Sequence, residues 1–215
     1  MILYGNLYSV YARTVRMVLS LKNVSYLLED IDPFEDGGKD ALRSVQPFGR
    51  VPTLEADGFT IYETQAILDY LEAVYPDPVL RPVGREAAAR MRQVMSVADS
   101  YFYWPLVRQA AVQHVFNPMQ GAPVDVAELE TGLDAAPRVL DALETLAAEA
   151  LVLRPGEITL ADCHLWPMMD YALMVPEIAE MVARRAHLAG WTAAMVETPV
   201  AQETAPDMEA LKADG

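Results

Sequence analysis

The 215-residue chain is 53% hydrophobic and 22% charged, so it has enough apolar side chains for a folded interior, and disorder is excluded as a description of the whole. Its length allows one or two domains, and two are expected. The 31 acidic residues outnumber the 16 basic ones and give a formal net charge of −15. This charge repels nucleic-acid phosphates and anionic lipids, so neither nucleic acid nor a membrane is an expected partner.

The first thirty residues predict a strand, a helix and a second strand. Residues 2–4 form a short apolar strand, and residues 25–31 a second one that ends before Pro33 and a glycine turn at 36–38. Between them, apolar side chains recur at helical spacing, at Tyr11, Val15, Val18 and Leu19. This order predicts a βαβ unit.

A β-hairpin and a helix follow the βαβ unit. Two apolar segments, 51–56 and 59–61, flank Asp57 and Gly58, a pair typical of a two-residue hairpin turn. Residues 63–75 then place four apolar side chains on one helical stripe that ends before Pro76. The order βαβ(α)ββα predicts a thioredoxin-like N-terminal domain over residues 1–77.

After a proline-containing linker at 78–84, residues 85–215 predict an all-helical C-terminal domain. We expect Pro137 to kink or divide one of its helices, and the acidic tail after Pro199 to be loosely held. The expected helical segments are residues 86–116, 124–149, 160–175, 178–187 and 190–197, with one more helical turn near 208–211. The fold class is therefore α/β plus all-α, a thioredoxin-like domain followed by a helical bundle.

The single cysteine, Cys163, cannot form an intramolecular disulfide, and the sequence has no C-x-x-C or Cys/His spacing for a metal. A basic leader and an apolar run near 18 residues are also missing from the sequence. We therefore expect a cytoplasmic protein without a bound metal.

Four short motifs occur in a fixed order along nearly the whole chain: residues 9–16, 47–54, 63–68 and 159–162. In this order and spacing the sequence resembles the glutathione S-transferase family, and in particular its cytosolic, serine-type, bacterial-like members. The resemblance implies that the thioredoxin-like domain binds glutathione as a co-substrate. It also implies a homodimer, in which the glutathione-binding half of one subunit packs on the long helices of the other.

The resemblance implies a set of glutathione-binding residues. A cis peptide bond between Val51 and Pro52 would expose the Val51 backbone to pair with the cysteinyl part of glutathione, although an ordinary strand-opening trans proline is the alternative. Arg50 would meet the glycyl carboxylate, unless it is only a solubilising side chain. Glu63 and Thr64 would bind the γ-glutamyl ammonium and carboxylate, unless they simply begin a helix.

Ser9 is the expected catalytic residue. It stands before a predicted helix, where the redox relatives of this fold carry a cysteine, and a hydroxyl there can donate a hydrogen bond to a bound thiolate. Tyr8 and Tyr11 are rival hydroxyls, since some branches of the family use a tyrosine. A purely structural role for Ser9 as the helix cap is the other alternative.

The implied reaction is addition of the glutathione thiolate to a small, apolar electrophile, as in detoxification. The residues expected to line the pocket for this second substrate are Leu7, Val10, Tyr101, Tyr103 and Trp104. A glutathione-dependent isomerase or dehalogenase, or an interaction module with little catalysis, is the alternative function.

Two further features are interpreted as structural. Thr159 and Asp162 fit a helix capping box and are left out of the catalytic set. The three histidines, His114, His164 and His187, show no spacing that suggests a metal ligand or a base.

Overall fold

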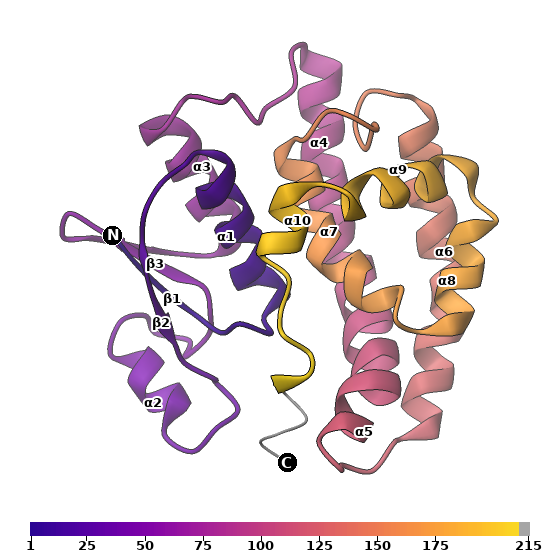
Figure 1. Cartoon of the computed structure of the whole chain (residues 1–215), viewed down its shortest axis with the longest axis horizontal. Helices are drawn as coiled ribbons and strands as arrows, with labels where there is room; N and C mark the ends of the chain where they lie inside the picture. Colours follow the sequence, from indigo (N-terminus) through magenta and orange to yellow (C-terminus); the bar gives the residue numbers. More distant parts are fainter. Residues whose placement is uncertain (211–215) are drawn as a thin grey trace. The chain divides into compact units, whose positions relative to one another are not determined.

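The computed structural model describes residues 1–210, and these residues divide into two compact units (Figure 1). The first, here called the sheet unit, comprises Met1–Leu80 together with Gln202–Pro206. The second, here called the helical unit, comprises Arg81–Ala201 and, among the described residues, 207–210. The last five residues of the expected C-terminal domain, and the end of the expected turn at 208–211, lie outside the described residues.

The sheet unit contains a four-stranded mixed sheet in the order β2-β1-β3-β4. In this sheet β1 pairs in parallel with β2 and antiparallel with β3, and β3 pairs antiparallel with β4. The parallel pair is joined through α1, and α1 packs against α3. The elements are β1 (Ile2–Gly5), α1 (Val10–Leu21), β2 (Leu27–Asp30), α2 (Gly38–Arg43), β3 (Thr53–Ala56), β4 (Phe59–Tyr62) and α3 (Thr64–Val74). The predicted thioredoxin-like order is confirmed.

Local turn chemistry explains the β3–β4 hairpin. Asp57 and Gly58 adopt φ angles of 52° and 79°, the left-handed conformations that a tight two-residue hairpin turn requires. Inside the sheet, Leu3 and Leu54 face each other across the β1–β3 pair and are fully buried. The hairpin and its register are therefore set by the turn pair and by the apolar residues of the strands.

The helical unit begins with one long helical run made of α4, η1 and α5. Over η1 the backbone hydrogen bonding is of the wider π type. The elements are α4 (Arg85–Val97), η1 (Ala98–Phe116), α5 (Asn117–Met119), α6 (Val126–Ala148), α7 (Leu160–Ala172), α8 (Pro176–Ala183) and α9 (Ala186–Val196). The last helix, α10 (Pro199–Glu203), begins in this unit, and its last two residues belong to the sheet unit. Among the described residues, no helix combines the length and the apolar character needed to cross a membrane.

The core of the helical unit forms around η1, α6 and α7. Gly132 of α6 lies so close to η1 that a Cβ atom there would be 2.5 Å from the carbonyl oxygen of Pro105, so only glycine permits this approach. Helix α7 is buried on nearly all sides, and its two buried polar side chains, Asp162 and His164, have hydrogen-bond partners. The predicted all-helical second half is therefore confirmed.

Several predicted helix boundaries are wrong. Helix α6 runs through Pro137 without being divided, so only the kink stays a prediction. The segment predicted as one helix at 178–187 ends at Ala183, and α9 begins at Ala186 rather than at 190. The reason is tertiary: Glu144 of α6 accepts hydrogen bonds from the backbone N–H groups of His187 and Leu188 and so caps the start of α9. The tail after Pro199 also contains a short helix, α10, which the sequence analysis missed.

Candidate active site

Ser9 lies at the N-cap of α1, directly after the loop that follows β1. Its backbone is extended (φ −75°, ψ 120°), and its Oγ accepts a hydrogen bond from the Ala12 N–H at 3.2 Å. The side chain therefore caps the helix, as the structural interpretation proposed. Capping uses the oxygen as an acceptor only, so the hydroxyl hydrogen can still be donated to a ligand atom.

The other loop and helix-start candidates surround Ser9. Leu7, Tyr8 and Tyr11 are half-buried, whereas Val10 is buried with 4% of its surface exposed. The Tyr8 backbone N–H donates to the Asn6 side chain at 3.0 Å. All of these residues belong to the sheet unit.

The segment before β3 is shaped by a buried glutamine. Gln46 donates from Nε2 to the Arg50 carbonyl oxygen at 2.8 Å, and its Oε1 accepts from the Phe48 N–H at 2.7 Å. The Val51–Pro52 peptide bond is cis, as the resemblance implied. Arg50 is exposed next to this bond, while Pro52 is buried.

Glu63 and Thr64 begin helix α3 in an unusual backbone conformation. Glu63 is the N-cap with φ 69° and ψ 117°, a positive φ that is uncommon for a residue other than glycine. Its side chain makes no capping hydrogen bond, so the simple helix-start role does not explain it. Thr64 is 8% exposed. The Glu63 side chain therefore does not cap α3, and the N-terminus of a helix suits an anion.

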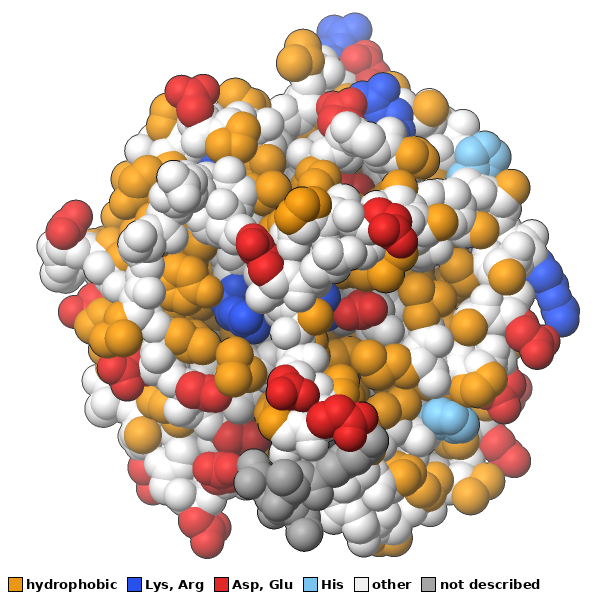
Figure 2. Space-filling view, in the orientation of Figure 1, with side chains coloured by type: hydrophobic (Ala, Val, Ile, Leu, Met, Phe, Trp, Pro, Cys, Tyr) orange, Lys and Arg blue, Asp and Glu red, His pale blue; other side chains and the backbone are white. Residues whose placement is uncertain are grey.

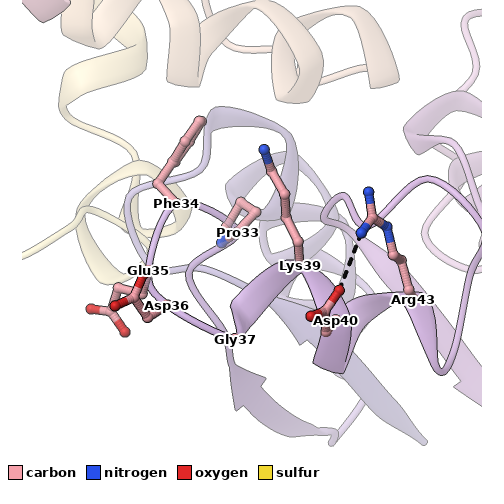
Figure 3. Close-up of a pocket in the computed structure, with 8 residues that line it drawn as sticks. All are labelled: Pro33, Phe34, Glu35, Asp36, Gly37, Lys39, Asp40 and Arg43. Carbon is pink, nitrogen blue, oxygen red and sulfur yellow. Dashed lines mark hydrogen bonds and ion pairs between the residues drawn. The ribbon is translucent and has the colours of Figure 1, made fainter.

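A cation on α2 lies beside the Arg50 segment and was missed by the sequence analysis. Lys39 borders Gly49: a Cβ atom on Gly49 would lie 3.0 Å from the Lys39 carbonyl oxygen and 3.5 Å from its Cβ. Lys39 also lines a surface hollow of about 340 Å³. In Figure 3, Lys39 and Arg43 project to the same side of α2, and Arg43 is paired with Asp40 at 3.1 Å. The sequence signal that could have identified this cation is a lysine directly after the glycine pair Gly37-Gly38.

The aromatic residues proposed for the second substrate all lie on η1 of the helical unit. Tyr101 and Trp104 are 65% and 60% exposed, Tyr103 is half-buried, and Phe102 between them is fully buried. This alternation follows from the helix, which turns one neighbour into the core and the next toward solvent.

The capping box at α7 is confirmed and has a further partner. Asp162 accepts hydrogen bonds from the Thr159 N–H at 2.8 Å, the Thr159 hydroxyl at 2.6 Å and the Trp191 indole N–H at 2.7 Å. Burial raises the pKa of Asp162 above its ordinary value, and the hydrogen bonds from Thr159 and Trp191 oppose that rise. These contacts identify Asp162 as a structural residue.

Two histidines have carboxylate partners that sequence spacing did not show. The imidazole of the buried His164 lies 2.7 Å from Asp99, and that of His187 lies 2.8 Å from Glu144. His114 is exposed. Among residues 1–210, no group of three or more His, Cys, Asp or Glu side chains is arranged to hold a metal ion.

The fold defines a class of protein in which a thioredoxin-like sheet precedes a helical bundle. A family model described as the N-terminal domain of glutathione S-transferase matches residues 3–79. Glutathione S-transferase F11 of Arabidopsis thaliana is 30% identical over 195 residues, covering 87% of this chain and 89% of that protein. The solved structure of glutathione S-transferase III in its apo form is 27% identical, with a TM-score of 0.80 and 94% of each chain covered. The chain belongs to the glutathione S-transferase family.

A second relative supports the same family. Glutathione S-transferase F7 of Arabidopsis thaliana is 26% identical over 204 residues, covering 93% of this chain and 96% of that protein. Both relatives come from a plant, so the expected likeness to bacterial members stays a prediction.

Proposed function

We propose that this glutathione transferase joins the thiolate of glutathione to small, largely apolar electrophiles, with Ser9 as the residue that stabilises the thiolate. The sheet unit carries every residue assigned to glutathione in this proposal. The aromatic residues Tyr101, Tyr103 and Trp104 of η1 are proposed to contact the electrophile, and Leu7 and Val10, predicted for the same role, belong to the sheet unit. The alternative of an isomerase or a dehalogenase would use the same glutathione site.

Glutathione is an anion, and most of this protein's surface repels anions. Acidic side chains are spread over the face shown in Figure 2, as the net charge of −15 leads one to expect. Binding therefore depends on local cations and helix N-termini. We assign the glycyl carboxylate to Arg50 and Lys39, the γ-glutamyl carboxylate to Thr64 and the start of α3, and the γ-glutamyl ammonium to Glu63.

The backbone at Val51 completes the proposed glutathione site. An extended peptide can pair with exposed main-chain groups at the edge of a sheet, which fixes its position without regard to side-chain identity. Held at its two ends and along its backbone, glutathione would present its sulfur at the N-terminus of α1. There the helix dipole and the Ser9 hydroxyl both favour a negative charge.

The single observation that carries the mechanism is the geometry of Ser9. Its Oγ accepts from Ala12 and keeps its own hydrogen for a thiolate. A thiol with a pKa near ~8.5 is only a few per cent ionised at pH 7, and a pKa about two units lower makes most of it thiolate. The gain is about twentyfold in the concentration of nucleophile.

The proposed mechanism is tested by turnover with a panel of small electrophiles. We expect Ser9→Ala to lower kcat/KM with glutathione by roughly twentyfold at pH 7, because the thiolate loses its donor. Ser9→Thr, which keeps a hydroxyl, is the matched control and should retain more activity. Unchanged kcat/KM in Ser9→Ala would contradict the mechanism, and product without a conjugate would favour an isomerase or a dehalogenase.

Truncation of the Glu63–Thr64 pair should weaken glutathione binding more than it lowers stability. Loss of a hydrogen bond to a charged group costs about 1.5 to 3 kcal/mol, or roughly 10- to 150-fold in affinity. Isothermal titration of Glu63→Ala and Thr64→Ala with glutathione measures this loss, and thermal melting reports the stability. Unchanged affinity in both variants would remove the two residues from the site.

The protein is further proposed to be a homodimer that acts in detoxification in the cytoplasm. One feature supports an interface: Phe48 is 61% exposed beside the glutathione segment, in edge contact with Tyr62. Exposed aromatic side chains of this kind are favoured at protein interfaces. Sedimentation at micromolar concentration should show twice the chain mass of 23.7 kDa, and a monomer would contradict the dimer.

A further inference from the structure

We infer that Asn6 and Asp30 are positioning residues that hold Ser9 in place for thiol activation. The inference rests on the proposed role of Ser9. Neither residue was a candidate on the sequence, because they are 24 residues apart and belong to different strand ends.

Asp30 anchors the loop that leads to Ser9. It is the last residue of β2 and pairs with Gly5, the last residue of β1, so its side chain stands next to the loop that begins at Asn6. Its Oδ1 accepts hydrogen bonds from the Leu7 N–H at 3.2 Å and from the Asn6 Nδ2 at 3.3 Å. The loop is thus tied to the sheet at its first two residues.

Asn6 carries the connection onward to Ser9. Its Oδ1 accepts from the Tyr8 N–H at 3.0 Å, and its carbonyl oxygen accepts from the Ser9 N–H at 3.0 Å. Three successive backbone N–H groups, those of residues 7, 8 and 9, are therefore held by Asp30 and Asn6. Such side-chain bonds to nearby backbone groups are what fix tight turns.

The position of Ser9 is consequently set from both sides. Upstream, its N–H donates to the backbone carbonyl oxygen of Asn6, whose loop the Asn6 and Asp30 side chains hold in place, and downstream, its carbonyl oxygen accepts from the Arg13 N–H at 2.9 Å. A hydroxyl that must meet a sulfur held elsewhere in the site needs this placement, because a shift of about 1 Å can cost on the order of a hundredfold in rate. Asp30 acts by position, through the two loop donors that its Oδ1 accepts from, and not through its charge.

Paired variants separate position from charge. Asn6→Ala and Asp30→Ala remove acceptors, whereas Asp30→Asn keeps an acceptor oxygen and removes the charge. We expect Asn6→Ala and Asp30→Ala to lower kcat about tenfold and to raise the pKa of bound glutathione toward that of the free thiol. Asp30→Asn should stay near wild type. Binding of S-methylglutathione, which has no ionisable thiol, should change by less than about twofold because its contacts are elsewhere.

Asp125→Ala is the matched control. Asp125 also accepts two backbone N–H groups, those of Ala127 and Glu128, but it caps α6 in the helical unit. Its loss should lower the melting temperature without moving the thiol titration. A merely structural role for Asn6 would give the same pattern in Asn6→Ala, and that result would overturn the inference.

A double-mutant cycle distinguishes this inference from the proposed function. If Asn6 acts through Ser9, Asn6→Ala should have little further effect on the thiol titration in the Ser9→Ala background. Fully additive effects would overturn the positioning role. If the Ser9→Ala variant has the same thiol titration as the wild type, the proposed function fails. If Ser9→Ala shifts the titration and Asn6→Ala does not, only the inference about Asn6 fails.

Discussion

Replacement of Asp162 by alanine is expected to lower the free energy of unfolding by about 3 to 4 kcal/mol, because the change leaves buried donors without an acceptor. Asp162 is fully buried and accepts from the Thr159 N–H, the Thr159 hydroxyl and the Trp191 indole. Each unsatisfied buried donor costs about 1 to 3 kcal/mol, and some relaxation or water entry reduces the sum. The loss would shift the melting temperature by roughly 10 °C in a chain of this size.

Chemical denaturation of the variant measures this loss. Glu144→Ala is the matched control, because Glu144 also accepts two backbone N–H groups but is less buried, and its loss should cost about 1 kcal/mol. The loss in Asp162→Asn should lie between the losses in Asp162→Ala and Glu144→Ala. Its amide oxygen can still accept from Thr159, whereas its amide nitrogen would face the Trp191 N–H donor. If Asp162→Ala lowers the free energy of unfolding by no more than Glu144→Ala does, the buried hydrogen bonds of Asp162 do not contribute the stability expected of them.

Replacement of Lys22 by methionine is expected to destabilise the sheet unit by about 3 to 5 kcal/mol, because it removes one partner of a buried ion pair and leaves two backbone carbonyl oxygens without their ammonium donor. The Lys22 side chain is fully buried, and its Nζ lies 2.5 Å from Glu72 Oε1. The same ammonium donates to the carbonyl oxygens of Tyr75 at 2.7 Å and Pro78 at 3.0 Å. All three ammonium hydrogens are used to tie the end of α1 to the end of α3 and the segment after it.

A second variant tests whether loss of the buried ion pair is the cause. Removing both partners in Lys22→Met/Glu72→Leu should recover part of the loss seen in Lys22→Met, because an apolar pair has no buried charge. Arg184→Met is the control: it breaks the exposed Arg184–Glu180 pair and should cost less than about 0.5 kcal/mol. A double variant less stable than Lys22→Met would contradict this explanation.

The sheet unit could be predicted from the sequence because its signals are local. The Asp57-Gly58 turn and the alternation of strands with the α1 stripe involve neighbouring residues, and they predicted the topology correctly. The break between α8 and α9 could not be predicted, because it depends on Glu144, more than forty residues away. Continuity of α6 through Pro137 likewise depends on packing rather than on propensity.

The sequence analysis named the candidate residues that stand in short sequence motifs, and it missed those that come together only in the folded chain. Ser9, Val51-Pro52 and Glu63-Thr64 stand in motifs that the sequence displays, and their roles remain predictions. Lys39 enters only because the chain folds back to bring α2 against Gly49. Asn6 and Asp30 meet only because β1 and β2 pair in parallel and end together.

The ionisation of bound glutathione tests the central claim most directly. The ultraviolet absorbance of the thiolate should be followed against pH in the wild type, Ser9→Ala, Tyr8→Phe and Tyr11→Phe. We expect the wild-type midpoint about two units below the free thiol value of ~8.5, a midpoint near the free value in Ser9→Ala, and little change in the tyrosine variants. An unchanged titration in Ser9→Ala, together with its loss in a tyrosine variant, would contradict the account.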